Sequence, residues 1–389
     1  MAYLAASLAS PLTIAFDAKR YFNNATGLGF YSRTLVGGLQ HFYPENRYLL
    51  YTPRIRGLWE GTGLEVKLPD SWLGKKLHPL WRSRGIVRQL QQDGVEIFHG
   101  LSHELPTGLQ KAGIRSVVTM HDLIFMRFPE LYPAVDRFFY KKKYGRAARE
   151  ADVVVAISQQ TRADLATYFN LSAQNIRVIG QSCDAEFERL SLRHEPGAQA
   201  FPLPEGLGVP ASDFIISVGS LTPRKNWHNL LEALFLLKNQ GVEVPLVAVG
   251  TGKSDYARQL RSKAEQLDLR VFWLEQHLSI RDLALLYRRA AALVYPSVFE
   301  GFGIPILEAM TVGIPVVTTQ GGCFEEVGGD AALYADPHHP EELAQQIAKA
   351  LGKELRAELT SKMPGQIEQF SPARICAAWM GVYKNLKTS

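Results

Sequence analysis

The chain alternates short apolar segments with longer segments of helical periodicity along almost its whole length. Eleven of the apolar segments, most of them containing Val or Ile, are each about as long as one strand. Apolar strands that alternate with helices are typical of parallel sheets covered on both faces. The sequence therefore predicts an α/β protein with doubly wound parallel sheets. The predicted strands lie at 12–18, 47–53, 95–100, 115–122, 151–158, 175–181, 214–220, 244–250, 269–275, 291–297 and 314–319.

The length of 389 residues exceeds what one hydrophobic core usually supports, so two domains are expected. Residues 191–212 are rich in Pro and Gly and have no clear period, which predicts a linker. This places an N-terminal acceptor-binding, Rossmann-like domain at 11–190 and a second Rossmann-like domain at 213–365. Residues 366–389 again have a helical pattern, and this tail is long enough to pack on either domain, including back on the first.

Hydropathy and cysteine usage exclude several classes of protein. The sequence contains no run of about 20 apolar residues, so no transmembrane helix is predicted. The first residues lack a basic n-region, so we interpret them as an extension before the first strand, with a cleaved signal peptide as the alternative. Cys183, Cys323 and Cys376 form no zinc spacing and no disulfide framework, so each is expected to be a small buried residue in a reducing cytosol.

The net charge of +5 is unevenly distributed. Residues 1–190 contain 24 Lys and Arg against 17 Asp and Glu, whereas residues 191–389 contain 19 against 21. The first half therefore favours an anionic partner, such as a phosphate-bearing substrate or an acidic membrane surface, with compositional drift as the alternative. Nucleic-acid binding is not predicted, because no basic stripe with interleaved aromatic residues extends beyond one predicted helix, 137–150.

Candidate ligand-binding residues follow the predicted strands, because open parallel sheets bind ligands beyond the carboxyl ends of their strands. Gly27 and Gly29 precede a predicted helix at 33–40, where glycines let backbone N–H groups approach an anion; a tight turn is the alternative. His99 and His121 end later strands and are expected to face one common space. His121, beside an Asp, is the stronger candidate for a hydrogen bond with a substrate hydroxyl.

Two cations stand before a helix in the second half of the chain. Arg224 and Lys225 directly precede a predicted helix at 227–238. A planar guanidinium and a compact ammonium at a helix N-terminus match the charge of a diphosphate. A solvated surface pair is the alternative.

Two carboxylates flank a glycine-containing turn in the same half. Glu300 follows a predicted strand, and Glu308 lies in a short helix predicted at 305–312, which begins with Pro and ends before Gly. Carboxylates accept hydrogen bonds from vicinal hydroxyls, and the amides of residues 301–304 can meet an anion or further hydroxyls. A ligand with two polyol ends and an anionic middle fits this pattern, and a nucleotide sugar is such a ligand.

These residues resemble the signature of the retaining glycosyltransferases of family 4, which have the GT-B fold of two Rossmann-like domains facing a central cleft. The resemblance rests on E-G-F-G-I-P-x-L-E-A-M and covers nearly the whole chain. Bacterial O-antigen and polysaccharide mannosyltransferases are among the similar proteins. The other matching segments are ATGLGFYSR, IFHG, MHDLIFMRFPE, VVAISQQTRADL, SVGSLTPRKNWHNLLEAL, LALLYRRAAALVYPSVF and EEVGGDAALYADPHHPEELAQQI.

The resemblance implies roles for the matching residues. Glu308 would hold the ribose hydroxyls of the donor, and Glu300 would contact the transferred sugar. Arg224 and Lys225 would neutralise the departing nucleoside diphosphate, and His121 would meet the hexose 6-hydroxyl. The further residues implied in donor binding are Gly27, Gly29, Ser220, Glu275, Gly301, Phe302, Gly303 and Ile304.

The resemblance also implies the chemistry, a front-face displacement in which the leaving phosphate takes the acceptor's proton. It implies no cofactor and no metal, because cations and helix dipoles stabilise the leaving group. Ser220 departs from relatives that have Arg there, and Glu275 departs from a Gly-x-Val pattern near the nucleobase. A carboxylate at 275 matches the N–H donors of guanine, which favours GDP over UDP; a surface acid is the alternative.

The function that follows is transfer of a hexose, with mannose from GDP-mannose as the first choice, to a glycan or a polyprenyl-diphosphate-linked glycan in cell-surface polysaccharide synthesis. The alternatives are a sugar-nucleotide epimerase or hydrolase of the same fold, and a non-catalytic partner subunit. Residues 137–150 mix aromatic residues with a Lys141–Lys143 run, which predicts either a membrane-surface helix or a solvated one. The predicted location is the cytoplasm or the inner face of the plasma membrane.

Overall fold

The computed structural model describes residues 10–55, 63–191, 206–276 and 278–388. Its contacts divide the chain into two compact units. Unit 1 contains residues 1–181 and 372–389, and unit 2 contains residues 182–371.

The bounds of the units differ from the predicted domain bounds at two places. Residues 182–190, which we predicted in the first domain, group with unit 2, and so do residues 366–371 of the predicted tail. Most of the predicted linker, residues 192–205, lies outside the described residues, as do residues 1–9 of the predicted N-terminal extension.

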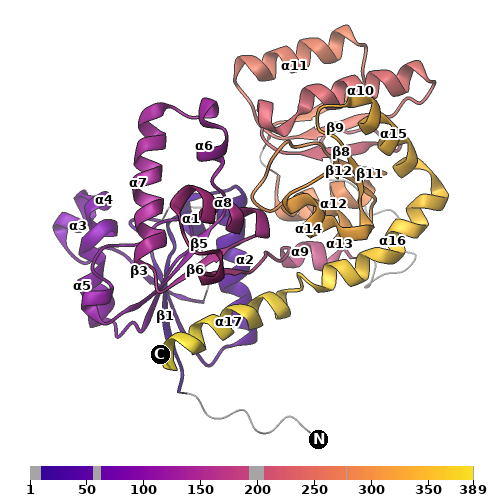
Figure 1. Ribbon diagram of the computed structural model, residues 1–389. Coiled ribbons are helices and arrows are strands. Elements are labelled where there is room, and N and C mark those ends of the chain that lie inside the picture. Colours follow the sequence, from indigo (N-terminus) through magenta and orange to yellow (C-terminus); the bar gives the residue numbers. More distant parts are fainter. Residues whose placement is uncertain (1–9, 56–62, 192–205, 277, 389) are drawn as a thin grey trace, which may run out of the picture. The chain divides into compact units, whose positions relative to one another are not determined.

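Among its described residues, unit 1 has one parallel sheet of seven strands in the order β3-β2-β1-β4-β5-β6-β7 (Figure 1). The strands are β1 (Thr13–Asp17), β2 (Arg47–Tyr51), β3 (Glu65–Lys67), β4 (Ile97–Gly100), β5 (Arg115–Met120), β6 (Val153–Ala156) and β7 (Ile176–Val178). The helices are α1 (Lys19–Asn23), α2 (Gly27–Phe42), α3 (Trp72–Lys76), α4 (His78–Leu80), α5 (Ile86–Gln92), α6 (Ile124–Arg127), α7 (Ala134–Glu150), α8 (Gln159–Phe169) and α17 (Pro372–Thr388).

Helices cover both faces of this sheet because side chains alternate along each strand. On β1, Ile14 and Phe16 belong to a buried cluster with residues of α2 and α17, whereas Ala15 belongs to a second cluster with residues of α5, α7 and α8. The C-terminal helix α17 is part of the first cluster through Trp379 and Tyr383, both fully buried.

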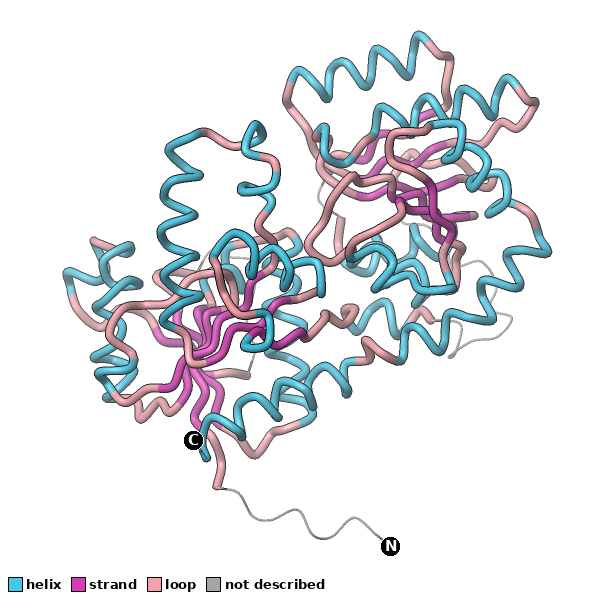
Figure 2. Tube along the Cα trace, in the orientation of Figure 1, coloured by secondary structure: helices cyan, strands magenta, loops and turns pink. Residues whose placement is uncertain are grey.

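Unit 2, among its described residues, has a second parallel sheet of six strands in the order β10-β9-β8-β11-β12-β13. Figure 2 shows the strands of both units in magenta and the helices in cyan. The strands are β8 (Ile215–Val218), β9 (Leu246–Val249), β10 (Val271–Leu274), β11 (Ala292–Tyr295), β12 (Val316–Thr319) and β13 (Leu333–Ala335). The helices are α9 (Ala185–Arg189), α10 (Trp227–Asn239), α11 (Asp255–Gln266), α12 (Ile280–Arg289), α13 (Ile304–Thr311), α14 (Cys323–Gly328), α15 (Pro340–Leu351) and α16 (Lys353–Glu368).

The predicted fold class is confirmed, since each unit is a parallel sheet of the Rossmann-like type, as in the GT-B fold. Every predicted strand contains an observed one. Two strands, β3 and β13, were not predicted. Each has only three residues, lies at a sheet edge and is mostly half-buried, so its sequence has no continuous apolar run.

The start of α2 corrects one prediction. We placed Gly27 and Gly29 in a loop before a helix at 33–40, but α2 already begins at Gly27. Asn24 explains the early start, because its side-chain Oδ1 accepts hydrogen bonds from the N–H groups of Thr26 and Gly29, at 2.8 and 3.2 Å. An Asn in this position satisfies helix-terminal donors that would otherwise lack a partner.

Candidate active site

The candidate site of unit 2 lies where the strand order of its sheet reverses. From β8 the chain continues outward to β9 and β10, and from β11 it continues to β12 and β13 on the other side. Crevices for ligands form at such a switch point, beyond the carboxyl ends of the two central strands. Arg224 and Lys225 follow β8, and Glu300 follows β11, so the predicted cations and the first predicted carboxylate meet there.

The two cations hold Glu300 between them. Glu300 Oε1 lies 2.6 Å from Arg224 Nη1 and 2.7 Å from Lys225 Nζ, and all three side chains are less than a fifth exposed. The Lys225 ammonium also donates to the hydroxyl of Tyr295, at 2.7 Å. An ammonium has three donors, and no described residue takes the third.

The charges of this cluster shift the pKa values of its members. Burial opposes the charge of Glu300, but Lys225 and Arg224 outweigh burial and lower the pKa of Glu300 to about 2. Burial lowers the pKa of Lys225, against the raising effect of Glu300. Glu300 is therefore a carboxylate at neutral pH, and a buried ammonium beside it gains from any further anion that approaches.

Two glycines bring the loops of the site close together. A Cβ at Gly219 would lie 3.0 Å from Lys225 Cε, so the lysine stem packs directly on the glycine backbone. A Cβ at Gly250 would lie 1.8 Å from the carbonyl oxygen of Gly219. We did not predict a role for either residue, although both directly follow strands and a glycine at a strand end is a signal for close backbone approach.

Glu308 lies one turn into α13, in a less charged setting than Glu300. It accepts a hydrogen bond from the Tyr287 hydroxyl at 3.0 Å. Burial raises the pKa of Glu308 to about 7, and the bond from Tyr287 opposes this only in part. The two predicted carboxyl groups thus differ in protonation near neutral pH: Glu300 is fully ionised, and Glu308 is close to the midpoint of its titration.

We expect the Glu308→Gln variant to become more stable relative to wild type as the pH rises. The carboxyl has a folded pKa of about 7 against about 4.5 when unfolded, so its protonated form stabilises the fold below pH ~4.5 and this stabilisation is lost by pH ~7. In urea unfolding, the free energy of unfolding of the wild type should fall by roughly 2–3 kcal/mol from pH ~5 to pH ~8, and that of Glu308→Gln should not show this fall. Glu265→Gln, at an exposed position of α11, is the control. Equal pH slopes in all three proteins would contradict the prediction.

The turn before α13 has the predicted form. The helix spans Ile304–Thr311 with Pro305 in its first turn, and Gly303 adopts a left-handed conformation with φ of 93°. Phe302 is buried and packs edge-on against Phe370, so only its backbone can meet a ligand. Pro305 has no N–H, and the N–H of Ile306 donates to the carbonyl of Gly303 at 3.0 Å. Of the first N–H groups of α13, that of Ile304 therefore remains a candidate for ligand contacts.

Ser220 and Glu275 lie at the carboxyl ends of β8 and β10 and are both exposed. The carbonyl of Ser220 accepts a hydrogen bond from Trp227 Nε1 at 3.0 Å. Glu275 forms an ion pair with Arg261 of α11. A nucleobase at this position would therefore share the carboxylate of Glu275 with Arg261.

Unit 1 contains the other predicted site residues, Gly27, Gly29 and His121. His121, which follows β5, is buried, and its Nε2 lies 2.8 Å from the carbonyl oxygen of Leu101. Because a carbonyl only accepts, Nε2 is protonated in the neutral ring, which leaves Nδ1 as an acceptor. Burial, with a smaller effect of His103, lowers the pKa of His121 to about 3. His121 is thus a neutral acceptor of hydrogen bonds across the physiological pH range.

His99 does not share that role, which corrects our expectation that both histidines face a ligand. The ring is fully buried, with Nδ1 2.8 Å from the Tyr383 hydroxyl and Nε2 2.8 Å from Thr119 Oγ1. Both nitrogens therefore have protein partners, and His99 joins α17 to the sheet.

Gly29 is also explained by packing. Its N–H is already occupied by Thr26 and Asn24, and a Cβ would lie 1.9 Å from the carbonyl oxygen of Asn24. Gly27 has open space around its Cα, so it retains the predicted access for a ligand.

The three cysteines are buried, as predicted. Within the described residues, no helix combines the length and the apolar character needed to cross a membrane.

Two family models together match most of the chain. Residues 27–187 match the model "Glycosyltransferase Family 4", and residues 207–365 match "Glycosyl transferases group 1". The chain belongs to the family 4 glycosyltransferases. The candidate site in unit 2 of this glycosyltransferase falls within the group 1 match, and the candidate residues Gly27, Gly29 and His121 fall within the family 4 match.

Curated relatives of the glycosyltransferase include proteins named as mannosyltransferases. The chain is 29% identical over 296 residues to O-antigen chain mannosyltransferase B of Escherichia coli, covering 75% of this chain and 74% of that protein. It is 27% identical over 226 residues to O-antigen chain mannosyltransferase RfbU of Salmonella typhimurium, covering 57% and 56%.

Solved structures share the fold of the glycosyltransferase. A glycosyltransferase from Rickettsia africae matches with a TM-score of 0.73 and 16% identity, covering 97% of this chain and 99% of that one. HepE of Anabaena, determined in complex with UDP and glucose, matches with a TM-score of 0.71 and 20% identity, covering 96% and 100%.

Proposed function

We propose that the glycosyltransferase moves a hexose, with mannose from GDP-mannose as the first candidate, to a glycan or lipid-linked glycan in cell-surface polysaccharide synthesis. The observation on which the proposal rests most is the Arg224–Glu300–Lys225 cluster at the switch point of unit 2. The names of the O-antigen mannosyltransferases among the relatives support the choice of mannose.

In this proposal the cluster receives the diphosphate and the sugar. Lys225 offers its third donor to the diphosphate, and Arg224 adds charge on the same side. Glu300 stays ionised and lies where it can accept from sugar hydroxyls while stabilising positive charge at the anomeric carbon. As the bond between the anomeric carbon and the donor phosphate breaks, the leaving phosphate takes the proton of the acceptor hydroxyl. The new bond to the acceptor oxygen therefore forms on the same face of the sugar, and the anomeric configuration is retained.

Glu308 would bind the ribose in the same proposal. Its carboxylate accepts from two vicinal hydroxyls only when it is deprotonated, so donor affinity should rise with pH around 7. Glu275 supports guanine as the base, although Arg261 already holds its carboxylate. Binding of GDP would therefore include rearrangement of this exposed ion pair.

A thermal-shift screen tests the donor. We expect GDP and GDP-mannose to raise the unfolding temperature by about 5–10 °C at a hundredfold excess over Kd, and UDP and ADP conjugates to do less. Larger shifts with UDP compounds would overturn the choice of base. No shift with any nucleotide would overturn the proposed donor site.

Product analysis then tests the reaction. With the selected donor and an acceptor, in the presence of EDTA, we expect transfer with the anomeric configuration of the donor retained, as read by NMR. Inversion of configuration, or loss of transfer on chelation, would contradict the proposed mechanism. Release or isomerisation of the sugar without acceptor would instead indicate a hydrolase or epimerase.

A further inference from the structure

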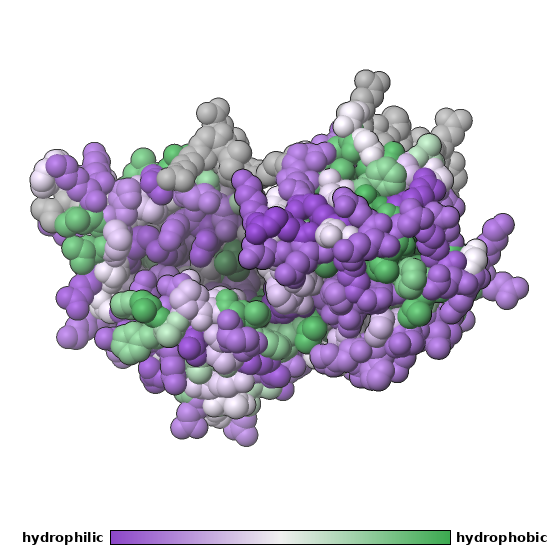
Figure 3. Space-filling model, turned by 90° about the horizontal axis from the view of Figure 1, so that it is seen from above, coloured by the Kyte–Doolittle hydropathy of each residue, from purple (hydrophilic) through white to green (hydrophobic). Residues whose placement is uncertain are grey.

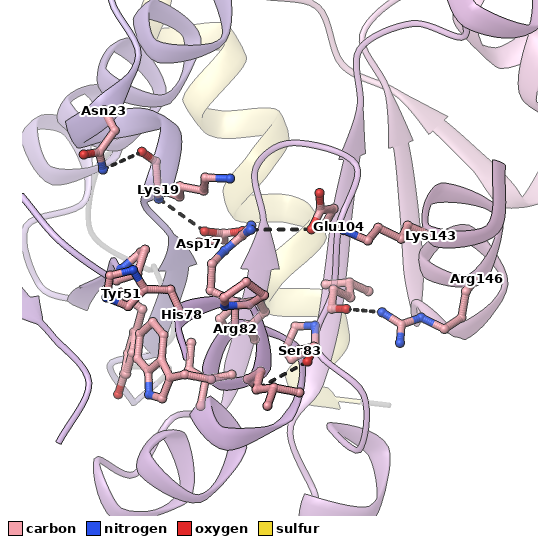
Figure 4. Close-up of a pocket in the computed structure, with 18 of the residues that line it drawn as sticks. Asp17, Lys19, Asn23, Tyr51, His78, Arg82, Ser83, Glu104, Lys143 and Arg146 are labelled. Carbon is pink, nitrogen blue, oxygen red and sulfur yellow. Dashed lines mark hydrogen bonds and ion pairs between the residues drawn. The ribbon is translucent and has the colours of Figure 1, made fainter. Parts of the chain in front are cut away.

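Unit 1 has a large cavity of its own, at the switch point of its sheet. The cavity has a volume of about 710 Å³ and lies beyond the carboxyl ends of β1, β2 and β4. Asp17 at the end of β1, Arg82, and Lys143 of α7 lie among its lining residues (Figure 4). Arg82 belongs to a π-helical turn, Trp81–Gly85, a rare local structure that is frequent at functional sites.

Positive charge dominates the cavity. Its lining contains six Lys and Arg side chains against two carboxylates. Both carboxylates pair with one cation, since Arg82 lies 2.5 Å from Asp17 and 3.6 Å from Glu104. No described residue forms an ion pair with Lys19 or Lys143. Figure 4 shows the ends of both lysines near the group formed by Arg82, Asp17 and Glu104.

Lys19 is the most informative of these cations. Its side chain is half-buried, unlike Lys142 and Lys143, which are exposed. Burial lowers the pKa of Lys19, and the neighbouring charges of Arg82 and Arg20 lower it further. Glu104 and Asp17 raise the pKa of Lys19 and compensate these effects only in part. A cation held partly out of water beside another cation is stabilised by an anionic ligand.

The rim of the same cavity is apolar and exposed. Leu80 and Phe139 both line the cavity, and their exposed fractions are 58% and 52%. Eight of the eleven exposed large apolar side chains among the described residues lie in 68–80 and 131–139, the segments that contain Leu80 and Phe139. Figure 3 shows that apolar groups form separate patches in a mostly hydrophilic surface on the visible face. Exposed apolar groups of this kind mark contact with a partner or a membrane.

We propose that this cavity binds a lipid that ends in a phosphomonoester or diphosphate, with the phosphate on the cations and the chain along Leu80 and Phe139. The excess of four positive charges matches a group with about two negative charges better than a phosphodiester headgroup with one. A phosphorylated compound without a chain would leave the apolar rim uncovered. The inference rests on the proposed function in one respect, since the lipid would be the carrier of the acceptor.

Vesicle flotation of the full chain tests the proposal. We expect binding to phosphatidylcholine vesicles that contain phosphatidic acid, and at least tenfold weaker binding when phosphatidylglycerol replaces it at equal surface charge. Lys19→Gln with Lys143→Gln should weaken binding to phosphatidic acid by roughly 10- to 30-fold, at about 1 kcal/mol per cation. Leu80→Ser with Phe139→Ser should weaken it similarly.

Matched controls keep this test separate from the donor site. Lys111→Gln and Phe42→Ser change an exposed cation and an exposed aromatic residue of unit 1 outside the cavity lining, and should bind like wild type. The nucleotide thermal shift should be unchanged in every variant, so a missing shift would report on the proposed function alone. Equal binding to both anionic vesicles would overturn the proposal in favour of a general acidic membrane. Inorganic phosphate that protects the chain thermally in a Lys19-dependent way, without vesicle binding, would overturn it in favour of a small anion.

Discussion

Replacing Lys225 with methionine is expected to lower kcat for sugar transfer by about 10²- to 10³-fold, the usual cost of removing one preorganised donor from developing negative charge. The ammonium is buried, is held by Tyr295 and Glu300, and has one donor that no described residue takes. Methionine keeps the apolar stem that packs on Gly219 and removes only the charge. The measurement is kcat and KM with the donor that the thermal-shift screen selects.

A second lysine-to-methionine variant tests whether the loss of kcat is specific to position 225 or follows from removing any lysine of unit 2. Lys349→Met changes an exposed lysine of α15 in the same unit and should leave kcat unchanged. The Lys225 variant should also lose most of the thermal shift caused by the nucleoside diphosphate, because the same ammonium meets the diphosphate before the reaction. A Lys225→Met enzyme that transfers sugar at the wild-type rate would show that this site is assigned wrongly.

The sequence predicted the sheets well because their signal is local. A buried parallel strand is a run of apolar residues, and each of the eleven segments that we predicted as strands contains one. The edge strands β3 and β13 have no such run. The start of α2 was missed because Asn24 acts through a side-chain bond to Gly29 that composition does not reveal.

The candidate site was predictable in its residue types but not in its pairing. Arg224, Lys225 and Glu300 each follow a strand, which the sequence shows. Their direct contact depends on β8 and β11 being neighbours in the sheet, and that order is a property of the tertiary fold. The same holds for Tyr287, which has no motif of its own and meets Glu308 only across two packed helices. His99 was misassigned because its partner Tyr383 is 284 residues away.

The Glu300→Gln variant is expected to lose sugar transfer and about 3 kcal/mol of stability at pH 7, because two buried cations then lack their carboxylate. The direction of the pH dependence of stability follows from the pKa of Glu300, which is about 2 in the folded protein and about 4.5 when unfolded. The carboxylate therefore stabilises the wild type above pH ~4.5, and this contribution is lost as the pH falls toward 2. In urea unfolding, the free energy of unfolding of Glu300→Gln should be lower than that of wild type at pH ~7, and this difference should be smaller at pH ~3. The control Glu265→Gln should have the wild-type free energy of unfolding at both pH values.

The same variant separates binding from chemistry. Glu300 occupies the cations that the diphosphate also needs, so its negative charge repels the ligand that the site receives. Removing one like charge at contact distance should tighten nucleoside diphosphate binding by about fivefold, or ~1 kcal/mol, as calorimetry can measure. Transfer should nevertheless be lost, because glutamine cannot stabilise positive charge at the anomeric carbon. If Glu300→Gln instead binds the nucleotide less tightly, the carboxylate orients the cations for the diphosphate, and its role is in binding rather than in the reaction.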